Sequence, residues 1–419
     1  MEDKNIRTVP SILLDAAAER GDADMIVIDG ERISWNQMVD RVEQVANALV
    51  AEGVNSQERV AFIDKNSAAY FEVAFGAAFL NAVAVAVNWR LAPQEMAYII
   101  NDSEAKVLII HEEFAEHLVA MEGDLINTKK IIVIGDSEEH VSYEVWRDTQ
   151  ETTFEPVPSS GDDVSMQLYT SGTTGLPKGA QLTNDNFNAV FENVDWFMNS
   201  ESRNLAVMPL FHIAGSGWAL YGMSCGATTV MTRELDPVAI LQLIETETIT
   251  HALFVPAVLQ FFLMIPSDEI NLSSMEWIVY GASPITQDVL VKSMEQFGCD
   301  YMQVYGLSET TGVVTQLDSQ DHDPGGSREH LLRSAGKPIQ GVELKIVDPD
   351  TETDMPDGEV GEVWIRSAQI MKGYWKMPEE TDEAITEDGW FRSGDAGYLE
   401  DGFMFIHDRV KDMIVSGGE

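Results

Sequence analysis

Cysteine is scarce in this sequence: Cys225 and Cys299 are the two thiols among 419 residues. Two cysteines form at most one bridge, so a fold held together by a disulfide framework is excluded. Their separation also lacks the close pairing of zinc ligands. We expect both side chains to be core or subsurface thiols.

Basic residues are scarce as well. The chain carries 26 lysines and arginines against 70 aspartates and glutamates, which gives a formal net charge of -44. A surface of this sign repels phosphate backbones and anionic lipid, so we expect no nucleic-acid partner. The acidic residues are spread along the chain. We interpret them as a solvated acidic surface suited to a saline environment, where salt screens the self-repulsion.

A long hydrophobic run is also missing. The longest apolar stretch, residues 73–87, is interrupted by Asn81 and is too short to cross a bilayer. The N-terminus, MEDKNIRTVP, lacks the basic and apolar regions of a signal peptide. We therefore expect no transmembrane segment and a cytoplasmic location. Hydrophobic residues still make up 45% of the chain, enough for two or three packed subdomains.

Residues 1–335 alternate helical and strand patterns, which is typical of an α/β fold with substantially parallel sheets. Residues 37–51 place their apolar side chains on one helical face. We predict that 1–335 form two interwoven α/β subdomains. Short runs rich in β-branched residues predict buried strands at 60–63, 83–87, 107–110, 131–134, 205–208, 228–231, 252–255 and 277–280.

The pattern changes after residues 318–330, DSQDHDPGGSREH, a polar segment that is typical of a loop. Beyond it, apolar residues alternate with polar ones, as in Val342, Leu344 and Ile346. This alternation predicts a small antiparallel, barrel-like β subdomain over residues 336–407. Residues 408–419 form a separate short segment.

One motif has the composition of a phosphate-binding loop. Residues 169–179 read YTSGTTGLPKG and follow an apolar run at 164–168. Glycines let backbone N–H groups approach an anion, hydroxyl groups donate hydrogen bonds, and Lys178 supplies positive charge. The loop of P-loop NTPases requires Ser or Thr after its lysine, and here Gly179 follows, so that class is excluded.

This motif resembles the phosphate loop of the adenylate-forming superfamily, which includes acyl-CoA synthetases, aryl-CoA ligases, luciferases and the adenylation domains of peptide synthetases. Further motifs follow in the order that this family shows, and their spread over most of the chain makes a chance resemblance negligible. They are MPLFH at 208–212, YGAS at 280–283, YGLSET at 305–310, GEVGEVWIRS at 358–367, MKGYW at 371–375, GWFRSGD at 389–395 and DRVKDMIVSGGE at 408–419.

The resemblance implies an ATP-dependent acid–thiol ligase. A carboxylic acid, expected to be a medium- or long-chain fatty acid, would react with ATP to an acyl adenylate and then with coenzyme A to an acyl-CoA. Pyrophosphate and AMP would be released. Bringing two anions together requires their charge to be neutralised, and the resemblance implies Mg²⁺ for this purpose. The implied partners are thus the acid, ATP and coenzyme A, and a homodimer is left open.

The resemblance also implies roles for individual residues. Thr170 and Glu309 would lie nearest the metal, a hard cation that prefers oxygen ligands. Lys178, Glu309 and His212 are the candidate catalytic residues. His212 resembles the histidine between the acyl carboxylate and the thiol entrance, and we do not assign it as a general base. The phosphate side would be surrounded by Thr170, Ser171, Gly172, Thr173, Thr174, Gly175 and Lys178.

Adenine and ribose have implied partners too. Tyr305 follows a predicted strand at 301–304, and its ring would lie against the purine, with Gly306 giving backbone access. Asp395 offers two acceptor oxygens to the ribose hydroxyls, and Arg409 would reach the same sugar. The remaining nucleotide contacts would come from the turn of Gly281, Ala282 and Ser283 and from Thr310.

The end of the sequence departs from the family pattern. The chain stops at Glu419, just past a hinge-like segment in which Lys411 takes the pivot position. The family continues into a smaller C-terminal domain that carries a second lysine. We therefore expect this chain to hold ATP and acid but to have low activity.

Several alternatives stay open at this point. The acid could be aromatic, as in ligases of the coumarate or benzoate type. The acceptor could be a carrier-protein thiol or an oxygen instead of coenzyme A. The chain could also be an inactive nucleotide-binding module.

Overall fold

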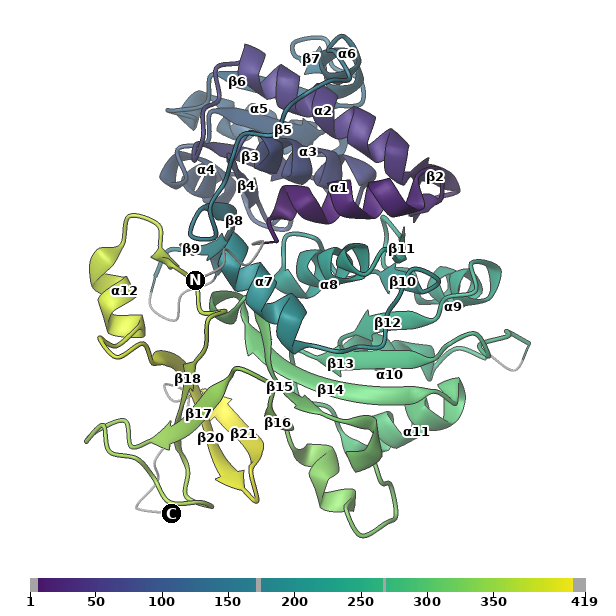
Figure 1. The fold of residues 1–419 in the computed structure, drawn as a ribbon, viewed down its shortest axis with the longest axis vertical. Coiled ribbons are helices and arrows are strands. Elements are labelled where there is room, and N and C mark those ends of the chain that lie inside the picture. The colour runs from purple at the N-terminus through teal and green to yellow at the C-terminus, as the bar shows by residue number, and fades with distance from the viewer. Residues whose placement is uncertain (1–6, 171–174, 267–268, 410–419) are drawn as a thin grey trace.

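The computed structural model describes residues 7–170, 175–266 and 269–409, without the side chains of 408 and 409. Three β-sheets organise these residues, and we name them sheets A, B and C (Figure 1). Sheet B lies in the upper part of Figure 1, sheet A below it, and sheet C beside sheet A. The predicted α/β class with largely parallel sheets and a small antiparallel sheet is confirmed.

Sheet B has eight strands and is parallel from β8 to β7. At its other edge, β9 and β19 are antiparallel to their neighbours. In spatial order its strands are β19 (Gly373–Tyr374), β9 (Lys178–Thr183), β8 (Val164–Thr170), β4 (Val83–Ala86), β3 (Arg59–Ile63), β5 (Val107–His111), β6 (Lys130–Ile134) and β7 (Val141–Ser142).

Both faces of sheet B are covered by helices, as a parallel sheet requires. In β3, Val60 and Phe62 belong to one core cluster, while Ala61 and Ile63 belong to another. Residues from α2 and α3 fill the first cluster and residues from α4 and α5 fill the second. The helices of this part are α1 (Val9–Arg20), α2 (Trp35–Ala51), α3 (Ala68–Phe79), α4 (Pro93–Asp102), α5 (Ala115–Met121) and α6 (Tyr143–Asp148).

Helix α2 shows how the sequence specifies its own local structure. The Ser34 hydroxyl accepts a hydrogen bond from the Gln37 N–H, and the Gln37 side chain accepts one from the Ser34 N–H. This reciprocal capping box fixes the start of the helix. The predicted apolar face at 37–51 is buried, with Met38, Val42 and Leu49 shielded from solvent.

Sheet A has nine strands, and its central part from β1 to β14 is parallel. Its spatial order is β16 (Lys337–Pro338), β15 (Gly312–Leu317), β14 (Asp300–Leu307), β13 (Trp277–Gly281), β12 (His251–Phe254), β10 (Arg203–Ala206), β11 (Thr228–Met231), β1 (Asp24–Ile28) and β2 (Glu31–Ser34). Helices α9 (Pro237–Thr246), α10 (Pro256–Phe262) and α11 (Gln287–Phe297) share a core with one face. Helices α7 (Asn184–Asn193) and α8 (Ile213–Ser224) pack in the core on the other side.

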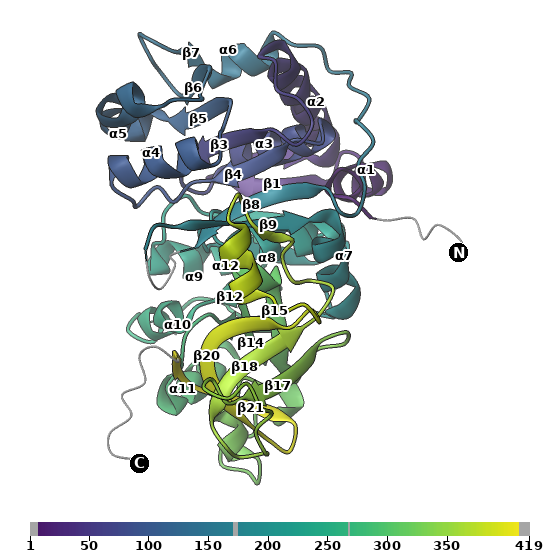
Figure 2. The same ribbon diagram turned by 90° about the vertical axis from the view of Figure 1, so that its left-hand side faces the viewer.

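Sheet C is antiparallel and curled, and it lies at the lower end of the molecule in Figure 2. Its order is β17 (Glu343–Val347), β18 (Gly361–Arg366), β20 (Phe391–Glu400) and β21 (Phe403–Arg409). Two short strands from the same part of the chain join other sheets: β16 extends sheet A and β19 extends sheet B. Helix α12 (Pro378–Ala384) follows β19. The domain limits at 335 and 407 stay predictions.

Two local predictions need correction. The strand expected at 205–208 begins and ends two residues earlier, as β10 (Arg203–Ala206). It ends before Pro209 because the backbone there forms hydrogen bonds with a side chain and not with a neighbouring strand. The Asn66 amide donates to the Met208 carbonyl at 3.2 Å and accepts from the Leu210 N–H at 3.1 Å. The segment 318–330, expected to be a loop, contains the short 3₁₀ helix η4 (Ser319–Asp321) and the start of η5 (Glu329–Arg333).

Among the residues that the model describes, no helix combines the length and apolar character needed to cross a membrane. Cys225 and Cys299 are unpaired and partly buried, as expected. Burial raises the pKa of both thiols, that of Cys299 to about 12.

His251 in β12 makes the stability of the fold dependent on pH. Its side chain is fully buried, and burial lowers its pKa to about 4. The unfolded chain takes up this proton near pH 6.5, so stability that is complete above that pH is lost as the pH falls toward 4. We expect a loss of about 2 kcal/mol from this group by about pH 5. His251→Gln should remove this part of the pH dependence of urea unfolding; an unchanged dependence would contradict the assignment.

Candidate active site

The glycine-rich motif connects the two strands of a hairpin. Strands β8 and β9 are antiparallel, and Thr170 at the end of β8 pairs with Lys178 at the start of β9. The predicted loop residues Ser171, Gly172, Thr173 and Thr174 lie outside the described part of the chain, and Gly175 is exposed beside them. The hairpin therefore brings the hydroxyl group of Thr170 and the amino group of Lys178 to the same end of sheet B.

Glu309 lies against this hairpin. It belongs to the 3₁₀ helix η3 (Ser308–Thr310), which follows β14, and only 8% of the residue is exposed. Its Oε1 atom accepts a hydrogen bond from the Thr170 hydroxyl at 2.9 Å and another from the Tyr374 hydroxyl at 3.0 Å. The structure thus brings together the two predicted metal ligands, from sheets that are separate in the fold.

Tyr374 was missed by the sequence reasoning, although its motif MKGYW was recognised. It lies in β19, paired with Ala180 of β9. The Tyr374 hydroxyl donates to Glu309, and the centroid of the Tyr374 ring lies 5.1 Å from the Nζ atom of Lys178. Burial, and then the charge of Glu309, raise the pKa of Tyr374, so its hydroxyl stays a donor. One aromatic side chain therefore links the lysine of the loop to the carboxylate.

The next residue anchors this strand. The guanidinium group of Arg59 stacks on the ring of Trp375, with 3.4 Å between its central carbon and the ring centroid. The Trp375 N–H donates to the Asp102 carbonyl at 2.9 Å, and the Asp102 carboxylate accepts from the Tyr169 hydroxyl at 2.6 Å. Burial lowers the pKa of Arg59 to about 10, so the group is still charged at neutral pH. These contacts hold β19 in place beside the hairpin.

Tyr305 and Asp395 are in direct contact. The Tyr305 hydroxyl donates to Oδ2 of Asp395 at 2.7 Å, and the Asp395 residue is 8% exposed. The expectation that Tyr305 follows its strand is wrong, because β14 continues to Leu307 with an irregularity between Tyr305 and Gly306. The strand continues because β15 pairs with it on the outer side. Sheet A and sheet C thus each supply one residue of the predicted nucleoside site.

The glycines of this region are required by close backbone packing. A Cβ atom at Gly306 would lie 1.8 Å from the Gly312 carbonyl oxygen, and one at Gly281 would lie 2.1 Å from the Val304 carbonyl oxygen. From the sequence, we expected Gly306 to be a glycine because its backbone must be open to a purine. The structure gives another reason, since the neighbouring strand β15 leaves no room for a side chain at this position. In the same turn as Gly281, Ala282 has a φ of 65°, and Ser283 is exposed. A left-handed alanine is strained, and such strain concentrates at functional sites.

Thr310 is buried within its own turn. Its hydroxyl oxygen lies 2.6 Å from the Gly312 carbonyl oxygen, to which it donates, and it accepts from the Leu307 N–H at 2.9 Å. These bonds shape the turn after β14, in which η3 carries Glu309. Its predicted nucleotide contact stays a prediction.

His212 is the N-cap residue of α8, and part of it is exposed to solvent. The Phe211 and His212 rings are 4.4 Å apart, and Phe211 also meets Trp89 edge-on. Burial by neighbouring atoms lowers the pKa of His212, and the charge of Arg90 lowers it further. The imidazole is therefore neutral at neutral pH. Arg90 itself lies over the Trp89 ring at 4.3 Å and was not found by sequence reasoning.

An apolar cavity of about 100 Å³ extends from the turn of Gly281 and Ala282 toward α7 and α8. Helix α8 supplies much of the wall. The lining includes Phe187, Val190, Phe191, Trp196, Ile213, Ala214, Gly217, Trp218, Tyr221, Leu253, Val304, Tyr305, Gly306 and Val313. Trp218 is fixed by a hydrogen bond from its N–H to the Leu205 carbonyl at 3.0 Å.

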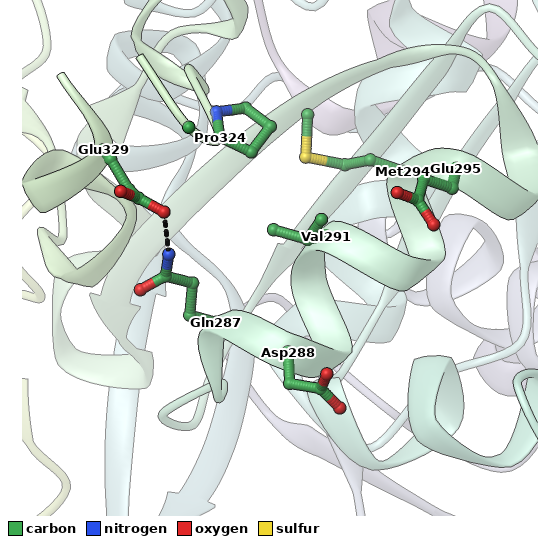
Figure 3. A pocket seen from close by; sticks show the side chains of 8 residues that line it. Gln287, Asp288, Val291, Met294, Glu295, Pro324 and Glu329 are labelled. Carbon is green, nitrogen blue, oxygen red and sulfur yellow. Dashed lines mark hydrogen bonds between the residues drawn. The ribbon is translucent and has the colours of Figure 1, made fainter. Parts of the chain in front are cut away.

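A larger hollow, of about 710 Å³, lies on the outer side of α11 (Figure 3). Three carboxylates, Asp288, Glu295 and Glu329, line it together with Val291, Met294 and Pro324. Gln287 donates a hydrogen bond to Glu329 across its edge. None of the predicted site residues lines this hollow, and we assign it no chemistry.

Two predicted residues lie at or beyond the end of the described chain. Arg409 is the backbone partner of Asp395 in the pairing of β20 with β21, which places the two residues side by side on sheet C. Lys411, the predicted pivot, lies outside the described residues.

The donor atoms fit a magnesium ion. The hydroxyl oxygen of Thr170 and the carboxylate of Glu309 are hard oxygen ligands, 2.9 Å apart. Magnesium commonly uses one or two protein oxygens and takes its other ligands from water and phosphate. The residues present are therefore of the right kind and number.

Comparisons with known proteins show the family of the chain. The family model described as "AMP-binding enzyme" matches residues 13–375. A fatty acid–acyl-carrier-protein ligase of Streptomyces coeruleorubidus is 35% identical over 404 residues, covering 94% of this chain and 75% of the relative. A feruloyl-CoA synthase of an Amycolatopsis species is 34% identical over 398 residues, covering 93% and 76%.

Solved structures agree as well. An anthranilate CoA ligase in complex with anthranoyl-AMP superposes with a TM-score of 0.91 at 27% identity, covering 99% of this chain and 80% of that one. The N-terminal domain of FACL13 from Mycobacterium tuberculosis superposes with a TM-score of 0.88 at 27% identity, covering 96% of this chain and all of that one.

The resemblance seen in the motifs is thereby confirmed. The family match spans residues 13–375, a range within which the hairpin, η3 and the lining of the apolar cavity lie, whereas Asp395 and Arg409 lie beyond it. The chain belongs to the family of AMP-binding enzymes, and it is an AMP-forming acid–thiol ligase.

Proposed function

We propose that this enzyme activates a fatty acid with ATP and transfers the acyl group to the thiol of coenzyme A. The observation that carries the proposal is the position of the apolar cavity. It ends at Gly281, Tyr305 and Gly306, beside Asp395 and close to the turn that carries Glu309. An acid whose tail fills this cavity presents its carboxylate toward the phosphate side.

The proposed chemistry has two steps. A carboxylate oxygen bonds to the α-phosphorus of ATP, and the bond from that phosphorus to pyrophosphate breaks. The thiolate sulfur then bonds to the acyl carbon, and AMP leaves with the electron pair. Both steps bring anions together, so their charge must be neutralised. Fixed hydrogen-bond donors and cations in an active site do this.

The site residues have distinct proposed roles. Thr170 and Glu309 would hold Mg²⁺, which neutralises phosphate charge when bound. Lys178 supplies a further positive charge on the phosphate side. Tyr305 and Asp395 bind the nucleoside, with Arg409 beside them. His212 is neutral, so it can orient the acyl carboxylate by a hydrogen bond.

Two classes of acid have support as the substrate. Relatives named for fatty acids favour an alkyl tail, and an apolar lining suits such a tail. An aromatic acid is the second candidate. It is favoured by the aromatic walls and by relatives named for feruloyl and anthranoyl groups.

The acceptor also has two candidates. Coenzyme A is the acceptor named for most of the related ligases, while the Streptomyces relative is named for an acyl carrier protein. A carrier protein must dock on the enzyme to deliver its thiol, whereas coenzyme A is a small molecule. We place the reaction in the cytoplasm, where ATP and coenzyme A are available.

The experiment that tests the proposal is ATP- and Mg²⁺-dependent release of pyrophosphate across a panel of alkanoic, cinnamic and benzoic acids. Thioester formation is then followed with coenzyme A and with a carrier protein. Release that depends on one class of acid identifies that class. No release with any acid in the panel would contradict the proposed function.

Lys178→Ala is expected to slow pyrophosphate release by about ten- to a hundred-fold, because a charged donor to phosphate contributes about 1.5–3 kcal/mol. The affinity for the acid, measured by calorimetry without ATP, should stay the same. Lys372→Ala is the matched control: this lysine pairs with Asp162 at the surface. Equal activity of Lys178→Ala and the parent enzyme would contradict the assignment of the loop.

A further inference from the structure

We propose that Trp196 is a removable end wall of the acyl cavity, and that its displacement lets long acyl tails pass into a groove on the surface of sheet A. This inference rests on the proposed function, since it takes the cavity to be the acyl site. It makes Trp196 the residue that determines which tail lengths the enzyme accepts.

Trp196 closes the inner end of the apolar cavity. Its residue is 5% exposed, and its ring lies 5.1 Å from the ring of Trp218 and 4.6 Å from that of Tyr221. The Trp196 backbone N–H also donates to the Tyr221 hydroxyl at 3.1 Å. All three aromatic residues line the cavity. Trp196 differs from the other two because it comes from the connection between α7 and β10, not from a helix.

A groove of about 500 Å³ lies on the other side of this wall. Its lining is mixed, with an apolar part formed by Phe197, Trp277, Met302, Pro338 and Ile339. Gln316 lines the groove as well and holds the Trp196 ring: the indole N–H donates to its Oε1 atom at 3.0 Å. Gln316 in turn donates to Asp318 at 2.8 Å. One side chain and one hydrogen bond thus separate cavity from groove.

The two hollows lie on one face of sheet A. Met302 and Val304 are two residues apart in β14, so their side chains point to the same face. Met302 lines the groove and Val304 lines the cavity. Gln316 of β15 is the direct partner of Val304 in the strand pairing, which places it on that face too. A straight tail that leaves the cavity along β14 therefore enters the groove.

The size of the cavity makes this passage necessary for long tails. Its volume is about 100 Å³, whereas an apolar cavity of roughly 150 Å³ holds benzene. The closed arrangement is therefore suited to a short tail. A medium or long alkyl chain needs the added volume of the groove.

The connection that carries Trp196 is built to move. Residues 194–199 form neither helix nor strand. The next residue, Phe197, has a φ of 57°, which is strained for a bulky side chain. The Phe197 residue is 52% exposed, and its ring stacks on the ring of Trp277 with 4.6 Å between the centroids. Strain in the closed form lowers the cost of leaving it.

The test compares binding of butanoic, octanoic, dodecanoic and hexadecanoic acids to the full chain and its variants by calorimetry. Trp196→Ala should bind dodecanoic acid at least about ten-fold more tightly relative to butanoic acid, because the end wall is gone. Gln316→Leu removes the acceptor that holds the indole and should shift the same ratio in the same direction, by a smaller factor. This second variant keeps Trp196 and guards against poor folding of the first.

The matched control is Trp146→Ala, which deletes another buried tryptophan, in α6 beside sheet B. Its affinity ratio should equal that of the parent chain. Unchanged ratios in both Trp196→Ala and Gln316→Leu would overturn the inference. Because binding is measured, this outcome is separate from the proposed function, which fails only if no acid supports pyrophosphate release.

Discussion

Replacing Glu309 with glutamine is expected to slow acyl-adenylate formation by about a hundred- to a thousand-fold, the usual effect of removing one fixed electrostatic group from an active site. Glutamine keeps the shape of the side chain and an acceptor oxygen for Thr170 and Tyr374. It removes the negative charge that would attract Mg²⁺. Pyrophosphate release, measured while Mg²⁺ is varied at fixed ATP, should show both a lower maximal rate and a higher Mg²⁺ requirement.

The control for this substitution is Tyr374→Phe. It keeps the ring against Lys178 and removes the hydroxyl that donates to Glu309. We expect a loss of about three- to ten-fold, since one hydrogen bond contributes about 1 kcal/mol. Titration of Mn²⁺ by paramagnetic resonance in the presence of ATP should show weaker ion binding in Glu309→Gln. Full activity with unchanged ion binding in that variant would remove Glu309 from the metal site.

The fold could be predicted from sequence wherever a strand is buried on both faces. The runs at 60–63, 107–110 and 228–231 lie within β3, β5 and β11, because a parallel sheet covered by helices demands continuous apolar residues. The short edge strands β16 and β19 could not be found in this way. Each has two residues, too few for any period, and each owes its conformation to a partner far away in the chain.

The sequence predicted those residues of the candidate site that lie in recognised motifs, but not the contacts between them. Thr170, Glu309, Tyr305 and Asp395 lie in recognised motifs, and the structure brings them together in two contacting pairs. Tyr374 lies in a recognised motif too, but its contact with Glu309 depends on β19 joining sheet B. Sequence patterns carry no information on such packing.

Other residues gave no signal at all. Trp196 and Gln316 look like ordinary core and strand residues, and their hydrogen bond spans 120 positions. Arg90 lies next to Trp89 in the sequence, but its position near Phe211 and His212 follows only from contacts between residues far apart in the chain. Long-range contacts between side chains of unremarkable type are the part that sequence reasoning misses.

The site therefore depends on three sheets. Sheet B supplies Thr170 and Tyr374, sheet A supplies Tyr305 and the turn of Glu309, and sheet C supplies Asp395. The hydrogen bond between Tyr305 and Asp395 spans sheets A and C, and the bonds to Glu309 span sheets A and B. A shift of one sheet against another would break these hydrogen bonds, and it would also disturb the shared core, which includes Val60 of sheet B, Val279 of sheet A and Val363 of sheet C.

Asp395→Asn is expected to raise the ATP concentration needed for half-maximal rate by about ten- to a hundred-fold. The physical reason is the loss of charge-assisted hydrogen bonds to the ribose hydroxyls, worth about 1.5–3 kcal/mol. Asparagine retains an oxygen that can accept from Tyr305, so the contact between sheets A and C is kept. The measurement compares ATP with 2′-deoxy- and 3′-deoxy-ATP in steady-state pyrophosphate release.

If Asp395 binds the diol, the parent enzyme discriminates against both deoxynucleotides and the variant loses much of that discrimination. Tyr305→Phe is the matched control, because it breaks the same hydrogen bond while the carboxylate stays in place. That variant should keep its discrimination between ATP and the deoxynucleotides, even if its affinity falls. An equal loss of discrimination in both variants would mean that Asp395 acts by holding Tyr305 and not by binding ribose. Unchanged discrimination in Asp395→Asn would remove the ribose role.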